Sequence, residues 1–340
     1  MRYELLRRRV ARPGVARPGQ ALPLLALLAI LLLPAPASAQ DALIGPLRFT
    51  DSPHGLVVGD YVGNQVLFLD RTTLQATSWI PIYTDSTQSE PGKPLSVGWL
   101  NGRLYVGEER TGRIQVFQWS AVGGKNKKLV YGWVQVSASL TAEPIVQPSA
   151  IAADPAAGLL FVASKGQKQV LVLDAAGNLV RTIGGAGSAA PLGNPQAIAL
   201  DPARQRVLVT DDSFIKSSSL GTTMYAVVQV YDYAGMPLGR VDGSTGAGNT
   251  AYKFARAQGV ALDATGRIYV ADSYRHEVLV IAESSTTPNT FTALAKLGGK
   301  GIEPGQLLMP TGVYIDAAAS KVYVANTLPG RVEVFGTVAP

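Results

Sequence analysis

The sequence predicts an all-β fold, a six-bladed β-propeller built from four-stranded antiparallel blades. A short unit of strand, tight turn, strand, loop and strand recurs six times along the 340 residues. Within each copy, apolar and polar residues alternate with period two, which is the pattern of strands. No long helical periodicity interrupts the copies. Repeats of this length specify a whole architecture rather than a local motif.

The clearest copy covers residues 259–281. It has a first strand at 259–263, a turn at 264–267, a second strand at 268–272 and a third strand at 278–281. The second strand marks every copy, and its central pair recurs at intervals of 47 to 61 residues. The pairs are Val57-Val58, Tyr105-Val106, Phe161-Val162, Leu208-Val209, Tyr269-Val270 and Tyr323-Val324. A four-stranded blade with its turns needs about 40–50 residues, and radial repetition of blades leaves few exposed edges.

The tight turns between strands share one pattern. Several begin with an aspartate, whose carboxylate can accept hydrogen bonds from the turn, and end with a glycine, where a positive φ costs little. This pattern occurs at residues 174–177, 232–235 and 263–266. It predicts short connections between antiparallel neighbours.

The copies divide residues 40–340 into approximate blades at 42–90, 91–144, 145–191, 192–250, 251–305 and 306–340. In the first blade, residues 51–60 align without a gap on residues 263–272, which places residues 47–51 in the first strand and His54 in the turn. The rival register begins the first strand at Gly55. The sixth copy ends after three strands, at residues 331–335, so residues 41–44 are the candidate outer strand that closes the ring.

The copies resemble the NHL-repeat family. Residues 269–278 look like the core signature of that family, and residues 297–301, 305–307 and 310–313 look like its linker into a new blade. The resemblance extends over nearly all of residues 42–340 and implies the propeller fold. Members of the family include lyases, hydrolases and pure binding platforms, so the activity has to be argued from the site.

The first 39 residues have the composition of a secretory signal peptide. Six arginines precede ten consecutive apolar residues at 24–33, and Ala37-Ser38-Ala39 forms a small-x-small cleavage site before Gln40. An uncleaved membrane anchor is the alternative, although the apolar run is short for a span. We therefore expect an exported protein, periplasmic or extracellular, with no membrane span after cleavage.

The positive charge belongs largely to that segment. Residues 1–39 carry a net charge of +5 out of +6 for the whole chain, which leaves about +1 for residues 40–340. A nearly neutral chain gives little electrostatic basis for nucleic-acid binding, so no nucleic-acid partner is expected. The absence of cysteine excludes disulfides, thiol catalysis and cysteine-ligated metal.

Two rings of residues are expected around the mouth of the central channel, where the loops before each first strand and after each second strand meet. The first ring is Leu95, Ser149, Gln196, Gln258 and Thr311, with Pro46 or, in the rival register, His54 from the first copy. The second ring is Asp60, Glu108, Ser164, Asp211, Asp272 and Asn326, with Glu109 and Asp212 beside two of its members. The expected binding face comprises Asp60, Glu108, Asp211, Asp212, Asp272, Asn326, Gln196, Gln258 and Thr311.

The acidic ring has two interpretations. Carboxylate oxygens suit Ca²⁺, so Asp60, Asp211 and Asp272 are candidate ligands of a divalent ion, and the family resemblance implies such an ion in its lactonase and hydrolase members. Alternatively, each aspartate caps a loop by accepting backbone N–H groups, a role that its repetition favours. A histidine-built zinc site is not expected, because the chain has only His54 and His276. No cofactor is expected, with Ca²⁺ as the one open alternative.

One connection breaks the repeat. The path from Asp211 to Val228 takes 17 steps, against 6 from Asp272 to Val278. The inserted residues are expected on the same face as both rings, and long loops in compact domains often bind partners or act as lids. The candidate partner anchors are Phe214, Ile215, Lys216, Met224 and Tyr225. An insertion without a role is the alternative.

Together these patterns favour a non-enzymatic binding or scaffold propeller. It would bind a protein or other macromolecule at the channel-mouth face, alone or within a larger assembly. No Gly-x-Ser-x-Gly, His-Glu-x-x-His or P-loop motif occurs, so no catalytic residue is assigned. Two alternatives stay open: a divalent-metal-dependent, lactonase-like lyase or hydrolase that uses the acidic ring, and a sensor that binds a small ligand through Gln196, Gln258 and Thr311.

Overall fold

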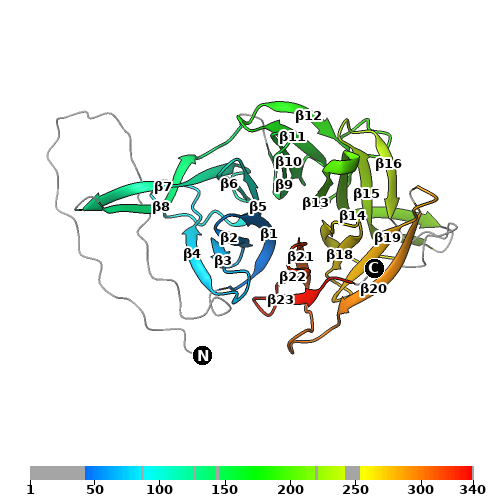
Figure 1. Cartoon of the computed structure of the whole chain (residues 1–340). Coiled ribbons are helices and arrows are strands. Elements are labelled where there is room, and N and C mark those ends of the chain that lie inside the picture. Colours follow the sequence, from blue (N-terminus) through cyan, green and yellow to red (C-terminus); the bar gives the residue numbers. More distant parts are fainter. Residues whose placement is uncertain are drawn as a thin grey trace.

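The described part of the chain forms six antiparallel sheets around a central axis (Figure 1). The computed structural model describes residues 43–338, apart from positions 86, 126–127, 142–144, 219–220, 242–252 and 289. Within these ranges one short 3₁₀ turn, Pro202–Arg204, accompanies the strands. The six-bladed β-propeller predicted from the repeats is confirmed.

Within each blade the strands pair in chain order, from the innermost to the outermost. Blade 1 contains β1 (Pro46–Ser52), β2 (Gly55–Asp60), β3 (Gln65–Leu69) and β4 (Ala76–Pro81). Blade 2 contains β5 (Pro94–Leu100), β6 (Arg103–Glu108), β7 (Ile114–Lys125) and β8 (Lys128–Ser137). Blade 3 contains β9 (Pro148–Asp154), β10 (Leu159–Ser164), β11 (Gln169–Asp174) and β12 (Leu179–Ile183).

The second half of the ring repeats this order. Blade 4 contains β13 (Pro195–Asp201), β14 (Arg206–Ser218), β15 (Gly221–Asp232) and β16 (Pro237–Val241). Blade 5 contains β17 (Ala257–Leu262), β18 (Ile268–Asp272), β19 (Glu277–Glu283) and β20 (Phe291–Gly298). Blade 6 contains β21 (Pro310–Asp316), β22 (Lys321–Asn326) and β23 (Arg331–Gly336). Each sheet lies within the residue range expected for its blade.

The innermost strands pack against one another around the axis, and β1 contacts both β5 and β21, which closes the ring. Two glycines permit this approach. A Cβ on Gly259 would lie 2.4 Å from the carbonyl oxygen of Thr311, and a Cβ on Gly312 would lie 2.3 Å from that of Leu47. Larger residues at these positions would push neighbouring blades apart.

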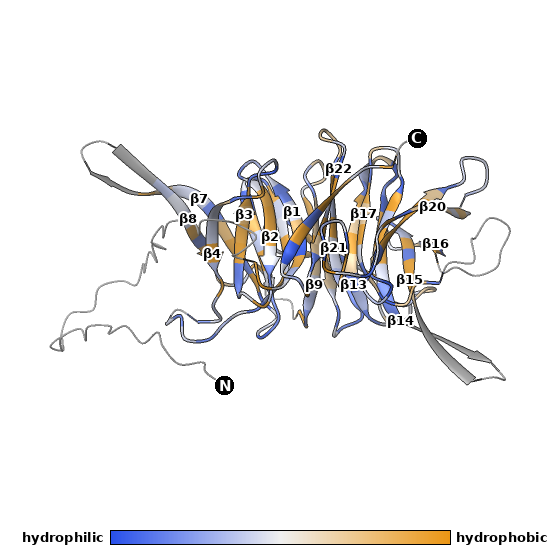
Figure 2. Cartoon of the chain, turned by 90° about the horizontal axis from the view of Figure 1, so that it is seen from below, coloured by the Kyte–Doolittle hydropathy of each residue, from blue (hydrophilic) through white to orange (hydrophobic). Residues whose placement is uncertain are grey.

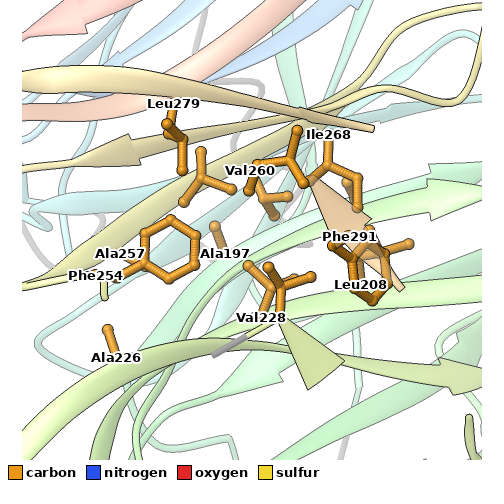
Figure 3. Packing of buried hydrophobic residues seen from close by; sticks show 14 of the residues in the cluster. Ala197, Leu208, Ala226, Val228, Phe254, Ala257, Val260, Ile268, Leu279 and Phe291 are labelled. Carbon is orange, nitrogen blue, oxygen red and sulfur yellow. The ribbon is translucent and has the colours of Figure 1, made fainter. Parts of the chain in front are cut away.

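Each pair of neighbouring blades shares one buried apolar cluster. Figure 3 shows the cluster between blades 4 and 5, whose buried members include Val228, Phe254 and Phe291. Full burial of one such side chain stabilises the fold by about 1.5–3 kcal/mol. The ring is therefore held by six interfaces rather than by one central core.

The register predicted for blade 1 is confirmed, because Ser52 pairs with Gly55 and His54 lies in the turn between β1 and β2. This turn is on the face opposite the channel mouth. His54 packs there against three tryptophans with ring centroids 5.1–5.8 Å away, at Trp99, Trp119 and Trp133. Burial lowers the pKa of His54. On the mouth face, His276 Nδ1 accepts a hydrogen bond from the backbone of Met309 at 3.2 Å, so the two histidines cannot share a ligand.

Blade 6 has three strands among the described residues, one fewer than the other blades. The outer strand expected from residues 41–44 is not formed by Leu43 and Ile44, and residues 41–42 lie outside the described ranges. Leu43 is instead buried against Tyr323 and Val332. The N-terminal segment therefore contributes a packed side chain, rather than a described strand, to the closure of the ring.

Two pairs of strands are longer than the rest. The β7–β8 pair joins a third strand to a fourth, whereas the β14–β15 pair joins a second strand to a third, so the two extensions project from opposite faces of the ring (Figure 2). The insertion expected as a loop after Asp211 is largely a hairpin, with Phe214 paired to Tyr225 and Ser218 paired to Gly221. No helix in the described ranges is long and apolar enough to cross a membrane.

Candidate functional site at the channel mouth

The six residues that end the second strands are completely buried. Asp60, Glu108, Ser164, Asp211, Asp272 and Asn326 each have an exposed fraction of 0%. Five of them bond to the linker that enters the first strand of their own blade. Their hydrogen-bonding groups are therefore directed at these linkers.

Three aspartates of this ring make the same contacts. The two carboxylate oxygens of Asp60 accept backbone N–H groups from residues 44 and 45 at 3.0 and 2.8 Å. Asp211 binds residues 193 and 194 at 2.7 and 2.8 Å, and Asp272 binds residues 255 and 256 at 2.8 and 3.0 Å. Such bonds satisfy buried donors. This geometry is the capping arrangement that the sequence left open.

The described residues contain no group of three or more histidine, aspartate or glutamate side chains that could hold a metal ion. A Ca²⁺ site at Asp60, Asp211 and Asp272 stays a prediction. These three carboxylates belong to different blades, and each already accepts two linker N–H groups.

Glu108 and Asn326 use other partners. Glu108 accepts hydrogen bonds from Arg113 Nε at 3.0 Å and from Gln115 Nε2 at 2.9 Å. Burial raises the pKa of Glu108, and these two donors oppose that shift. Asn326 Oδ1 accepts the backbone N–H of Leu308 at 2.7 Å, the neutral counterpart of the aspartate caps.

The channel mouth is formed instead by the residues one position further along. Successive side chains of an extended chain point to opposite sides, so the neighbours of a buried cap can turn toward the axis. The residues in this position are Tyr61, Glu109, Lys165, Asp212, Ser273 and Thr327. Two of them meet the polar residues predicted before the first strands: Asp212 binds Gln196 and Gln258, and Thr327 Oγ1 lies 2.7 Å from Thr311 Oγ1.

Asp212 is the centre of the largest polar group at the mouth. Its oxygens accept hydrogen bonds from Gln196 Nε2 at 3.1 Å and Gln258 Nε2 at 3.0 Å, and Arg256 Nε lies 3.5 Å away. Burial raises the pKa of Asp212, against the opposing effects of Gln196, Lys165 and Arg256. Burial lowers the pKa of Lys165, which Asp212 opposes. The two shifts reduce the difference between the pKa values of Asp212 and Lys165. Perturbed pKa values of this kind are typical of functional sites.

Blades 1 and 2 supply a second polar group to the mouth. The hydroxyl of Tyr61 donates a hydrogen bond to Glu109. Burial and the neighbouring Glu109 carboxylate raise the pKa of Tyr61 to about 12, so this hydroxyl stays protonated at neutral pH. The ammonium of Lys93 lies 5.4 Å from the centroid of the Tyr61 ring. This geometry is that of a cation–π contact.

Arg48 lies in the channel beneath the mouth and joins four blades. Its Nε donates to the carbonyl oxygen of Ser149 at 3.1 Å, and its Nη2 donates to that of Gln196 at 2.9 Å. Its Nη1 donates to the carbonyls of Thr311 at 3.1 Å and Leu47 at 3.0 Å. Burial lowers its pKa to about 10, so the guanidinium is still charged at neutral pH. The remaining cavity, about 40 Å³, has room for little more than water.

Sequence reasoning missed Arg48, although a signal for it exists. The first-strand residues in the equivalent register are small in four other blades: Ser96, Ala150, Ala197 and Gly259. Arg48 has a long charged side chain at this position, which lies nearest the axis. Such a side chain can only extend along the channel. Comparing this position across the copies would have singled it out.

Exposed apolar side chains surround the polar mouth. They lie in the linkers and in the turns between second and third strands, with exposed fractions of 47–64%. They are Ile44, Val62, Val146, Tyr274, Ile302 and Leu328. Among the described turns of the opposite face, Met236 is the exposed large apolar residue. The two faces of the ring therefore differ in chemistry.

The β14–β15 hairpin rises on the mouth face, because it continues directly from Asp211. Five of its residues were predicted as partner anchors: Phe214, Ile215, Lys216, Met224 and Tyr225. Their backbones pair across the hairpin, while their side chains lie outside the described ranges. Their role as anchors stays a prediction.

Comparison with known proteins agrees with this architecture. The NHL repeat model matches residues 254–281, the span of the clearest sequence copy. This chain is a six-bladed β-propeller that contains an NHL repeat. No curated protein matches it.

Solved propellers are similar to this NHL-repeat propeller in fold. Hydrazine synthase of Kuenenia stuttgartiensis shares 16% identity at a TM-score of 0.51, over 88% of this chain and 97% of that chain. An auxiliary nutrient binding protein of Bacteroides thetaiotaomicron shares 12% at 0.57, over 87% and 69%. Virginiamycin B lyase of Staphylococcus aureus shares 12% at 0.51, over 91% and 89%. At such identities the similarity establishes the fold alone.

Proposed function

We propose that this NHL-repeat propeller is an exported binding module that captures a protein partner on its channel-mouth face. The observation that carries the proposal is the ring of exposed apolar side chains around a charged mouth. Exposed apolar surface concentrated on one face is a feature of protein-interaction sites. The opposite face offers no comparable ring among its described turns.

The polar mouth would give such a contact its orientation. Asp212, Arg256 and Lys165 place charges of both signs close together at the centre of the face. Complementary charges suppress wrong partners and fix the docking register more than they add affinity. Tyr274 combines both kinds of contact, because it is exposed and its hydroxyl accepts a hydrogen bond from Arg256 Nη1 at 2.9 Å.

Export is supported by the composition of residues 1–39, which has the three parts of a secretory signal peptide. A periplasmic or extracellular location follows if that segment is cleaved after Ala39. Several exposed apolar residues on one face would then meet partners outside the cytoplasm, alone or in a larger assembly.

The binding face can be tested by placing charges in the apolar ring. The double variant Tyr274→Asp, Leu328→Asp should weaken partner binding on the order of tenfold or more, because exposed apolar anchors carry much of the energy of an interface. The partner would first be captured from an extract of the native organism on immobilised protein and then titrated in purified form. A second variant that lacks residues 213–223 tests the hairpin in the same assay.

A matched control carries the same change on the other face. Met236→Asp, Leu179→Asp alters two exposed apolar residues away from the mouth and should leave capture unchanged. Circular dichroism would establish that all variants are folded. Equal loss in both double variants, or undiminished binding by Tyr274→Asp, Leu328→Asp, would reject the mouth as the binding face.

A second function is favoured by the opposed pKa shifts of Asp212 and Lys165. A carboxyl with a raised pKa beside a lysine with a lowered pKa could transfer protons to or from a small molecule seated at the mouth. Such a ligand would lie above Arg48, since the cavity in the channel below is only about 40 Å³. The sensor alternative, with Gln196 and Gln258 as ligand contacts, would use the same place. The metal-dependent alternative needs Asp272 or its counterparts as ligands.

The shift at Asp212 predicts a pH-dependent stability. Because the folded pKa is raised, the protonated carboxyl favours the folded state, and this contribution is lost as pH rises from about 4 through the raised value. Asp212→Asn is neutral throughout, so the free energy of unfolding of the wild type relative to this variant should fall as pH rises. Urea unfolding between pH 4 and pH 7 measures it. A relative stability that rises with pH would show that the hydrogen bonds to the carboxylate outweigh its burial.

A further inference from the structure

We infer that a groove between blades 4 and 5, on the face opposite the channel mouth, binds a small ligand that carries a phosphate or sulfate monoester. The groove has a cavity volume of about 540 Å³, within the range of small-ligand pockets. It lies at the turns between first and second strands and between third and fourth strands. It is therefore separate from the mouth-face site and independent of the function proposed for that site.

Arginines predominate among the charged residues that line the groove. Three of its lining residues are arginines, Arg204, Arg206 and Arg267, and one is a carboxylate, Glu283. Hydroxyl groups come from Thr265, Ser284 and Ser285. Such a lining matches a compact anion attached to a polar, hydroxyl-bearing body better than it matches an apolar ligand.

Arg206 forms the fixed floor of the groove. It begins β14 and reaches toward blade 5, where its Nη1 donates to Glu283 Oε2 at 2.7 Å. Its Nη2 donates to Asp201 Oδ2 at 3.0 Å within blade 4. Its Nε is buried without a hydrogen-bond partner in the described structure. This arginine is thus held by carboxylates on both blades and keeps one buried donor unsatisfied.

Arg204 and Arg267 make fewer hydrogen bonds to carboxylates than Arg206 does. Arg204 Nη1 donates to Asp201 Oδ2 at 3.0 Å, yet 56% of the side chain is exposed. Arg267 Nη1 donates to the carbonyl of Val338 and lies 3.9 Å from Asp263 Oδ2. A guanidinium has five N–H donors, so the largely exposed Arg204 keeps donors for a ligand. The side chain of Arg267 is 13% exposed, and it lines the groove with the part that stays accessible.

The backbone places the two arginines against each other. Arg204 ends the 3₁₀ turn, and the left-handed Gln205 (φ 51°) reverses the chain into β14. The guanidinium of Arg204 then rests on the turn of blade 5, where a Cβ on Gly266 would lie only 2.7 Å from its Nη1. Arg267 follows Gly266 directly, so arginines from two blades face one groove.

Arginine forks bind tetrahedral oxyanions through paired, charge-assisted hydrogen bonds, which lysine cannot reproduce. The volume exceeds what a free phosphate or sulfate ion needs, and the serine and threonine hydroxyls can bind the rest of an ester. The ligand class that fits is therefore a sugar-sized phosphate or sulfate monoester.

Calorimetric titration of the purified protein with glucose 6-phosphate, glucose 6-sulfate, glucose and inorganic phosphate tests this inference. Both esters should bind, inorganic phosphate should bind more weakly, and glucose should not bind. Arg204→Gln and, separately, Arg267→Gln should weaken ester binding on the order of tenfold or more. Arg103→Gln, at an exposed arginine that begins β6, should bind as the wild type does.

Three results would overturn the inference. The site does not exist if neither ester binds, or if Arg103→Gln weakens binding as much as the groove variants do. Equal affinity for inorganic phosphate and the esters would show a site for free oxyanions, which removes the ester from the proposal. Arg204 is largely exposed, so its variant should fold, and a thermal unfolding curve without ligand would establish that before titration.

Discussion

Replacing Asp272 with alanine should lower the free energy of unfolding by roughly 3–5 kcal/mol, through the loss of a buried cap. The carboxylate is completely buried and accepts the backbone N–H groups of Ala255 at 2.8 Å, Arg256 at 3.0 Å and Arg275 at 3.3 Å. Alanine leaves these three part-buried donors without their acceptor. Urea unfolding of the wild type and the variant measures the difference.

Two further variants separate capping from metal binding. Asp272→Asn keeps one acceptor oxygen, so it should lose less stability than Asp272→Ala. Asp85→Ala removes an aspartate from an exposed loop, where it bonds Thr87 and Ser89, and should change stability far less. Metal content would be measured on protein purified without chelator. Asp272 would instead be a metal ligand if Asp272→Ala had the same free energy of unfolding as the wild type but lost about one tightly bound divalent ion per chain.

The fold could be predicted from the sequence because its signals are local and repeated. Strand alternation and aspartate–glycine turns depend on residues that are near neighbours in the chain. In the structure, Asp263 accepts hydrogen bonds from the backbone of Thr265 at 2.9 Å and Arg267 at 3.0 Å, as its place in the turn predicts. Asp174 bonds the backbone of Ala176 and Asn178 in the same way.

The direction of each side chain at the mouth was harder to predict. Asp211 and Asp212 are adjacent acids, yet Asp211 bonds the linker while Asp212 meets Gln196 and Gln258 at the channel. Which member of such a pair faces the axis depends on where the strand stops pairing, and period-two alternation makes an error of one residue decisive. The sequence pattern therefore groups these acids at one edge of the blades, but it does not separate the acid that lines the mouth from the acid that caps the linker.

The form of the insertion after Asp211 could not be predicted either. Its serines and threonines are compatible with a loop and with a polar hairpin, because strand propensity depends on the surface that a strand covers. The structure shows paired strands as far as Ser218 and Gly221. Continuing the neighbouring strands, with one register shift between Asp211 and Phe214, costs less conformational entropy than ordering a separate loop.

The other large effect is expected at Arg48. Arg48→Met should lower the free energy of unfolding by about 2–4 kcal/mol, because carbonyl acceptors on blades 3, 4 and 6 lose a charged donor. Arg48→Lys keeps the charge but not the planar fork, so it should recover only part of this loss. Arg103→Met, at an exposed arginine on β6, is the matched control and should have little effect.

Hydrogen exchange would show where Arg48 acts. Arg48 donates to carbonyl groups of β1, β9, β13 and β21, so Arg48→Met should increase exchange in these strands more than in β5 or β17, whose carbonyls accept no hydrogen bond from Arg48 in the described structure. Arg48 also helps to hold down the pKa of Lys165, after the larger effect of burial. Its removal should therefore raise the Lys165 pKa and change the charge balance at the mouth. Uniform exchange across all six blades, or unchanged stability, would mean that water replaces the guanidinium and that ring closure depends on the apolar interfaces alone.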